Sequence, residues 1–289
     1  MGLSVNTNVA AINAYRNLSA TQTSLSKSLE KLSSGFRINR AADDAAGLAI
    51  SEGLRSQISG LTQAARNAQD GISVVQTAEG ALTEVHSILH RMRDLAVQAA
   101  NDSNSTEARA NITTEANQLS AELDRIAKST NFNGTTLLDK VSGGTGATMN
   151  FQVGADGDAN SRIAVDLSSA NVASVATAVS FAASATATVG LNMFSHVSAQ
   201  AAISAIDAEI SKISTARANL GAYQNRFEHT INSVNVAVEN LSASESRIRD
   251  TDMASEMVNF TKSQILSQAG TAMLAQANAI PQGVLKLLS

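Results

Sequence analysis

Residues 203–248 read ISAIDAEISKISTARANLGAYQNRFEHTINSVNVAVENLSASESRI, and this stretch decides the fold. Apolar residues recur in it every seven positions, at Ile206, Ile213, Leu220, Phe227, Val234, Leu241 and Ile248. A second seam holds Ile203, Ile210, Ile231 and Val238 and is interrupted by Arg217, Gln224 and Glu245. An apolar heptad sustained over this length specifies a coiled-coil-like helix. At about 1.5 Å per residue the helix spans roughly 65–70 Å, which predicts a rod.

A matching helix is predicted for about 45–100. Its seam comprises Leu54, Leu61, Ala68, Val75, Leu82 and Leu89, with Ile58, Ala65 and Ile72 beside them. Gly53, Gly60, Gly71 and Gly80 lie inside this helix, and each costs about 1 kcal/mol relative to Ala. We therefore expect close packing, or the approach of another backbone, to offset that cost.

A third helix is predicted for about 107–130, where Ile112, Ala116, Leu119, Leu123 and Ile126 share one face. The turn-forming run Asn101-Asp102-Ser103-Asn104-Ser105 separates it from the helix before it. A link this short makes the two helices antiparallel neighbours.

Residues 131–200 have a different pattern. Asn133-Gly134 and the glycines of 143–146 are turn signals. Residues 149–153 and 162–167 alternate in the manner of short strands, whereas 170–190 has only weak periodicity. We predict a small β-rich lobe with loops.

The two ends of the chain resemble each other in their apolar patterning. Val5, Val9 and Ile12 begin an amphipathic helix that continues to Leu32, and Met253, Met257 and Phe260 begin a stripe that continues to Leu274. Pro281 is expected to break this second helix. Such helices are marginal alone in water, so they need each other or the ends of neighbouring molecules.

Composition excludes several functional classes. The 289 residues are 44% hydrophobic but only 3% aromatic, with one Pro, no Cys and a formal net charge of −4. Small apolar residues suit closely packed helices, and the single Pro suits long ones. The charge offers no basic field for nucleic acid or an anionic membrane, and the absence of Cys excludes disulfides and thiolate chemistry. We expect no cleaved signal peptide and no membrane span.

Several longer motifs resemble those of bacterial flagellins. On the N-terminal side these are Leu32-Ser33-Ser34-Gly35-Phe36-Arg37-Ile38-Asn39, Asp43-Asp44-Ala45-Ala46-Gly47-Leu48-Ala49-Ile50, the segment 76–82 (QTAEGAL) and the segment 93–98 (RDLAVQ). On the C-terminal side they are the segments 220–227 (LGAYQNRF), 246–250 (SRIRD) and 274–278 (LAQAN). The resemblance covers about 1–140 and 200–289.

This resemblance implies a mainly α fold: a long antiparallel helical coiled-coil or bundle rod with paired terminal helices and a small β-hairpin-rich lobe. Residues 1–44 and 246–289 would form a discontinuous inner domain at the filament core. Residues 45–245 would form an outer rod domain that includes 131–200. Only about 60–70 residues separate the two conserved halves, so a short form with little or no outer domain is expected.

The resemblance also implies a function and partners. The chain would polymerise with itself outside the cell as the flagellar filament, after type III export. Its other partners would be an export chaperone at the C-terminal helix, the flagellar cap and hook-junction proteins, and the vertebrate Toll-like receptor that senses flagellin. Filament-core packing would fall to Val5, Val9, Ile12, Met257, Phe260 and Leu274, and the rod core to Ile206, Ile213, Leu220, Phe227, Val234 and Leu241.

Arg91, Leu95 and Glu115 match the positions by which flagellins contact both the receptor and the neighbouring subunit. Arg91 and Leu95 are one helical turn apart and lie off the seam of Leu82 and Leu89. We expect an exposed Leu95 beside Arg91, with Glu115 on the antiparallel partner helix. His90 stands where the family pattern has Gln.

Catalytic and metal-binding interpretations are weaker. His86 and His90 have zinc-ligand spacing, but Ser87 replaces the Glu of the H-E-x-x-H motif and no third ligand is near in sequence. Adjacent Asp43 and Asp44 would point about 100° apart on a helix, which suits a capping or interface role better than a shared proton. We therefore predict no catalytic residue, no metal site and no cofactor.

Three alternatives stay open. A hook–filament junction protein has similar ends but caps a filament instead of propagating it. An enzyme would need a catalytic insertion, for which 131–200 offers one His and no motif. A coiled-coil adhesin or effector would fold without its ends.

Overall fold

A computed structural model describes residues 7–139, 148–181 and 191–288, with side chains as far as residue 280. The chain divides into two compact units, Met1–Ile58 with Glu239–Ser289, and Ser59–Val238. The long helices are α1 (Val9–Ser34), α2 (Ala45–Ala99), α3 (Thr106–Ser129), α5 (His196–Arg249) and α6 (Met253–Leu288). α2 and α5 each contribute to both units. The mainly α prediction is confirmed.

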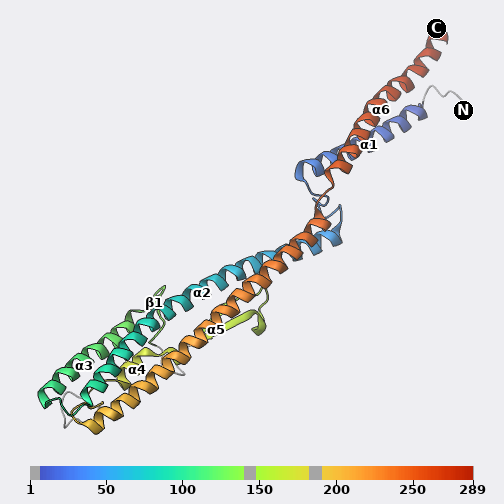
Figure 1. The fold of residues 1–289 in the computed structure, drawn as a ribbon. Helices are drawn as coiled ribbons and strands as arrows, with labels where there is room; N and C mark the ends of the chain where they lie inside the picture. Colours follow the sequence, from blue (N-terminus) through green and yellow to red (C-terminus); the bar gives the residue numbers. More distant parts are fainter. Residues whose placement is uncertain (1–6, 140–147, 182–190, 289) are drawn as a thin grey trace. The chain divides into compact units, whose positions relative to one another are not determined.

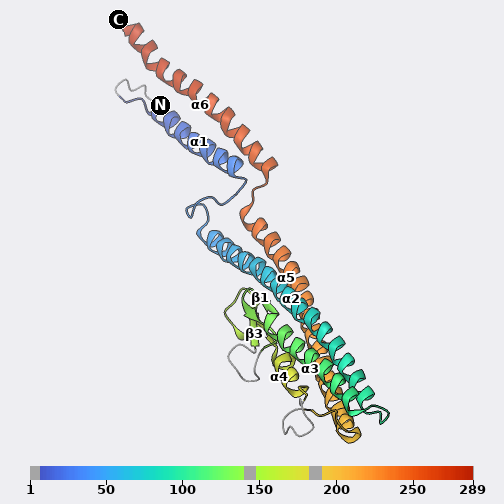
Figure 2. The ribbon, with the colours of Figure 1, turned by 90° about the vertical axis from the view of Figure 1, so that its left-hand side faces the viewer.

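In the unit of residues 59–238, α2, α3 and α5 lie side by side (Figures 1 and 2). The heptad of α5 faces inward: the side chains of Ile206, Ile213, Leu220 and Phe227 are at most 1% exposed, and Val234 is 7% exposed. Leu241, the next member, lies in the other unit and is half-buried. The ring of Phe227 packs edge-on against Phe151, with centroids 5.5 Å apart.

α2 packs against two helices, α3 and α5, and forms an ion pair with each. Arg91 pairs with Glu115 of α3, whereas Arg93 pairs with Asp207 of α5 at 2.6 Å. Contact with two helices buries more than one row of apolar side chains. Of the predicted row, Ala68, Val75, Leu82 and Leu89 are buried, whereas Leu54 and Leu61 are half-buried. α2 also buries Leu95 and a second heptad row, which comprises Gly71, Ala78, Val85, Met92 and Ala99.

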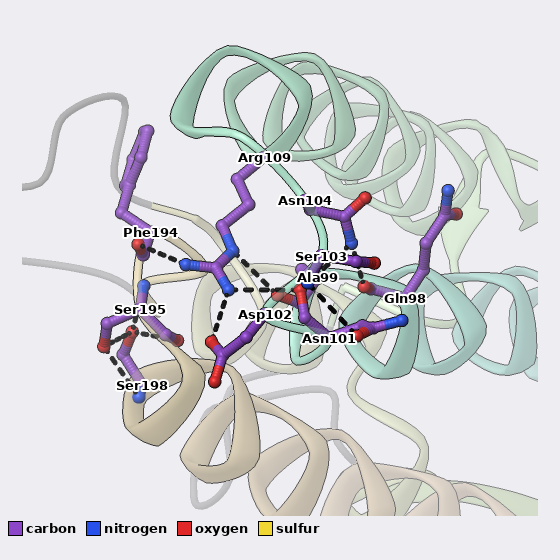
Figure 3. A network of polar contacts seen from close by, with 10 residues as sticks. All are labelled: Gln98, Ala99, Asn101, Asp102, Ser103, Asn104, Arg109, Phe194, Ser195 and Ser198. Carbon is purple, nitrogen blue, oxygen red and sulfur yellow. Dashed lines mark hydrogen bonds and ion pairs between the residues drawn. The ribbon is translucent and has the colours of Figure 1, made fainter.

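The turn between α2 and α3 is held by polar contacts of Arg109, one of which reaches the carbonyl of Phe194 just before α5 (Figure 3). Arg109 donates to the carbonyl oxygens of Ala99, Asn101 and Phe194 at 3.0–3.2 Å and to the carboxylate of Asp102 at 2.9 Å. Its side chain is only 12% exposed. The guanidinium thus satisfies carbonyls at the end of α2, where helix geometry leaves them without partners.

The segment 131–200 is partly as predicted. β1 (Asn131–Phe132) and β2 (Thr135–Thr136) form a hairpin whose turn, Asn133-Gly134, has φ values of 49° and 79°. β3 (Thr148–Gln152) pairs antiparallel with β4 (Arg162–Asp166), so Phe151 faces Ile163 across the ladder. The predicted turn at 143–146 falls outside the described residues.

A short helix was not predicted in this segment. α4 (Val172–Ala178) buries Val172, Val175 and Ala176 and docks on α3, where Ser120 donates to the carbonyl of Ala176 at 3.0 Å. Two single-turn helices, η1 (Ala159–Ser161) and η2 (Ser168–Ala170), flank β4. The lobe is therefore mixed rather than mainly β.

The unit of residues 1–58 and 239–289 pairs the two chain ends. α1 and α6 run antiparallel, since Asn8 donates to the carbonyl of Ala277 at 2.8 Å and Gln22 lies against Ser267. α1 ends at Gly35, whose φ of 76° closes the helix in the left-handed conformation. The expected break at Pro281 is wrong, because α6 continues to Leu288. Proline lacks one helical hydrogen bond and crowds the turn before it, which can bend a helix without ending it.

Candidate assembly and recognition surfaces

Large exposed hydrophobic side chains concentrate on the paired terminal helices. Among the described residues they include four on α1 and seven on α6. Val9 is 61% exposed, Ile12 50% and Met257 49%, while Phe260 and Leu274 are half-buried. Val5 falls outside the described residues. The packing of α1 against α6 therefore leaves much of their apolar surface exposed to water.

The exposed apolar side chains of α6 form an open groove of about 490 Å³. It is lined by Met257, Val258, Thr261, Lys262, Ile265 and Leu266. Val258, Ile265 and Leu266 were not selected from the sequence. The sequence does contain a signal for them, the apolar pairs Met257-Val258 and Ile265-Leu266. Two adjacent apolar residues in every two turns make the apolar face of a helix wider than one partner helix can cover.

Few side chains are buried between the terminal helices. Ser28 is the buried residue of α1, and Glu256 and Ala277 are those of the part of α6 whose side chains are described. Close contact occurs at Gly270, where a β-carbon would lie 3.1 Å from Cδ1 of Leu18. The α1–α6 pair is therefore held by small residues and a few polar contacts, in contrast to the packed core of residues 59–238.

Arg91 and Glu115 come together on the exposed face of α2 and α3, as the antiparallel arrangement predicts. Nε and Nη2 of Arg91 donate to the same oxygen of Glu115, at 3.0 and 2.6 Å. Their side chains are 56% and 46% exposed. An exposed pair contributes little to stability, so its charges stay available to a partner molecule.

Leu95 is not where the sequence analysis placed it. Its side chain is 1% exposed and belongs to the hydrophobic core that also contains Ile112 and Ala116 of α3. The expectation of an exposed Leu95 is wrong. It considered only the seam of Leu82 and Leu89, whereas α2 also buries a face towards α3. Leu95 thus holds α2 against α3 and leaves the polar pair as the accessible part of this surface.

The adjacent aspartates are backbone caps. Asp43 accepts from the amides of Asn39 and Arg40 at 3.2 and 3.0 Å, and Asp44 accepts from the amide of Gly47 at 2.8 Å. The amides of Arg40 and Asn39, in that order, hold the pKa of Asp43 below its usual value. The predicted capping role is confirmed.

Two of the chain's histidines lie side by side on α2. His86 and His90 contact each other, with 2.9 Å between their Nε2 atoms. Within the described residues no group of three or more His, Asp or Glu side chains is placed to hold a metal ion. In the same residues, no helix combines the length and the apolar character that crossing a bilayer requires.

Comparisons with known proteins agree along almost the whole chain. A family model described as the bacterial flagellin N-terminal helical region matches residues 5–142, and one described as the bacterial flagellin C-terminal helical region matches 203–288. Only residues 143–202 lie between the two matches, which makes this a short form.

Curated relatives and a solved structure are also similar. Flagellin of Halalkalibacterium halodurans is 51% identical over 284 residues, covering 98% of this chain and 99% of the relative. The flagellar filament 33 kDa core protein of Treponema phagedenis is 49% identical over 294 residues, with the same coverage of 98% and 99%. The crystal structure of Bacillus cereus flagellin is 32% identical, with a TM-score of 0.47, over 62% of this chain and 94% of that one. On the two family models and the full-length relatives, the chain belongs to the bacterial flagellin family.

Proposed function

We propose that this chain is the structural subunit that polymerises into the extracellular filament of a bacterial flagellum and so serves swimming motility. The family membership and the names of relatives that match over their full length, flagellin and flagellar filament core protein, support this role. The role is mechanical and involves no catalytic step.

The observation that carries the proposal is the apolar surface of α1 and α6. Residues such as Val9, Ile12 and Met257 are about half exposed or more. Burying apolar area is favourable by roughly 25 cal/mol per Å², so several such side chains per subunit give a strong drive to associate. Copies of the same helix pair, packed against one another, would remove this surface from water and leave the polar faces outside.

The two parts of the chain would then have different tasks. Residues 1–44 and 246–289 would form the inner layer of the filament, in which the terminal helices of many subunits bundle. Residues 45–245, with the lobe at 131–200, would form the outer layer. The dense core around Leu82, Leu89 and Phe227 supports this division, because burial of these large apolar side chains would stabilise that part without neighbouring subunits.

Before assembly the same apolar helix needs protection. The groove along α6 supports binding of an export chaperone to the C-terminal helix, since an amphipathic partner helix would cover Met257, Ile265 and Leu266. At the ends of the filament the subunit would contact the cap and the hook-junction proteins.

A second role concerns recognition of the monomer by the vertebrate Toll-like receptor for flagellin. Arg91 and Glu115 support it, because both are about half exposed and present a planar donor fork beside an acceptor. Leu95 would contribute by keeping α2 and α3 in register. The same face would contact the neighbouring subunit in the filament, so only the free monomer would be recognised.

Seeded assembly tests the proposed function. Purified full-length protein, mixed with short filament fragments and viewed by electron microscopy, should elongate them into long filaments. A hook–filament junction protein would instead decorate the ends and stop growth. Fragments that stay short at a large excess of monomer would contradict the proposal.

A further inference from the structure

His86 and His90 form a close pair on α2. Their Nε2 atoms are 2.9 Å apart, and the two rings are nearly perpendicular, at 83°, with centroids separated by 4.4 Å. The i, i+4 spacing places both imidazoles on one face of the helix.

The backbone beneath the pair is firmly held. Val85 and Leu89, the neighbours that precede each histidine, are both fully buried in the core. The backbone therefore fixes the Cα and Cβ atoms of the two histidines relative to each other, and only the side-chain torsions can change. His90 is exposed and His86 is half-buried, so a solute can reach the pair.

The two Nε2 atoms are at hydrogen-bonding distance, so one imidazole donates its proton to the lone pair of the other. Both nitrogens therefore face the space between the rings, and a metal ion would take the place of the shared proton.

The separation of the nitrogens is short enough for both to bind one ion. With metal–nitrogen bonds of about 2.0–2.1 Å, two ligands have their nitrogens about 2.9 Å apart at a right angle and about 3.3–3.4 Å apart at the tetrahedral angle. The observed 2.9 Å is the length of the hydrogen bond between the rings, and rotation of the rings reaches either separation.

Against the expectation of no metal site, we propose that His86 and His90 form a bidentate site for a divalent transition metal, Cu(II) before Ni(II). Water would fill the remaining positions, since the described residues supply no third ligand. The ordinary affinity order of such ions puts Cu(II) first at nitrogen sites.

The surroundings of His86 limit the strength of the site. Its Nδ1 atom is buried and has no hydrogen-bond partner. When Nε2 binds the metal, the ring proton moves to Nδ1, where the N–H group lacks an acceptor and incurs a desolvation cost. Metal-binding histidines usually have such an acceptor. The site is therefore exchangeable, weaker than a structural metal centre.

Copper titration of the full-length monomer at neutral pH, in a buffer that does not bind metals, tests the proposal. Calorimetry should give one Cu(II) per chain, and electron paramagnetic resonance should show two imidazole nitrogens on the copper. His86→Gln or His90→Gln should each weaken binding roughly tenfold or more, since the chelate is lost. His229→Gln, which removes an exposed histidine of α5, is the matched control and should change nothing.

Three outcomes would overturn the proposal. The first is a His86→Gln/His90→Gln double variant that binds Cu(II) as tightly as the wild type. The second is a wild-type spectrum with fewer than two coupled nitrogens, a result that does not depend on any variant folding. The third is tighter binding of Zn(II) than of Cu(II), which would contradict the affinity order expected of two imidazole ligands.

Discussion

Gly71 of α2 lies directly against the ring of Phe227 of α5. A β-carbon at position 71 would stand 2.7 Å from Cζ of that ring and 2.9 Å from Cε1. Phe227 is fully buried and packed against Phe151, so its ring has little room to move. The missing side chain at Gly71 is what lets α2 and α5 approach each other here.

Gly71→Ala should therefore destabilise the fold although Ala favours helices. Overpacking costs about 1–3 kcal/mol, and the better helix propensity returns about 1 kcal/mol, so a net loss of up to about 2 kcal/mol is expected. Gly80→Ala is the matched control: the same helix has open space there, and stability should rise by up to about 1 kcal/mol. Thermal unfolding of the two monomers followed by circular dichroism compares them. Equal rises in Tm would show that Gly71 is not a packing site.

Arg109→Ala should loosen the end of the helical bundle. It removes charge-assisted hydrogen bonds to three backbone carbonyls and leaves those acceptors poorly satisfied, a loss on the order of 3 kcal/mol. Asp102→Asn keeps those bonds and alters only an exposed partner, so it should cost less than about 1 kcal/mol. Urea unfolding measures both, and similar losses for the two variants would refute the role assigned to the carbonyl contacts.

The terminal helices should exchange their amide hydrogens quickly in the monomer. α1 and the described part of α6 bury almost no apolar side chains, whereas α5 buries a continuous row from Ala199 to Val234. Local opening costs little where few contacts are lost. Hydrogen–deuterium exchange read by mass spectrometry should show fast exchange over about 7–40 and 250–280, and slow exchange in α2, α3 and α5 between residues 59 and 238. Equal protection in all three regions would mean that the ends are already stable before assembly.

The receptor role predicts a difference between single variants. Arg91→Ala should weaken activation of the flagellin-sensing Toll-like receptor by on the order of thirtyfold, about 2 kcal/mol, as for a central interface arginine. Glu115→Ala should also weaken it, while the fold changes little because the pair is exposed. Dose–response curves from reporter cells, with depolymerised protein and Arg125→Ala as an exposed control on α3, measure this. An Arg91→Ala curve that overlays the wild type would leave this surface with a subunit-contact role alone.

The long helices could be predicted because their periodicity is sustained. The rows through Ile206 and Leu82 have enough repeats to specify period and inward face, and the cluster at 101–105 fixes an antiparallel link. The family motifs then indicated the function. Apolar periodicity was equally informative for β3 and β4, whose alternation across Phe151 and Ile163 is preserved in the ladder.

The other features depend on which elements pack against each other, which the sequence pattern does not show. Leu95 was expected on the surface because a single apolar seam accounts for packing against one helix, whereas α2 packs against both α3 and α5. Gly71 and Gly80 look alike in sequence, but only Gly71 meets a neighbouring side chain. α4 is too short for periodicity to decide, and its helix is fixed by a cap at Asn171 and by docking on α3. Nothing in the sequence singles out Arg109, whose role depends on the carbonyl of Phe194 arriving from far along the chain.

Truncation at the C-terminus tests the central claim, that α1 and α6 drive assembly, most directly. A variant ending at residue 249 lacks α6 but keeps the whole core of residues 59–238. Circular dichroism should show that it remains a cooperatively unfolding helical protein. In seeded assembly beside the full-length chain, followed by sedimentation and electron microscopy, the full-length protein should form long filaments and the truncated one should stay in the supernatant. Filaments from the truncated chain would contradict the account, because they would place the polymerising contacts outside the terminal helices.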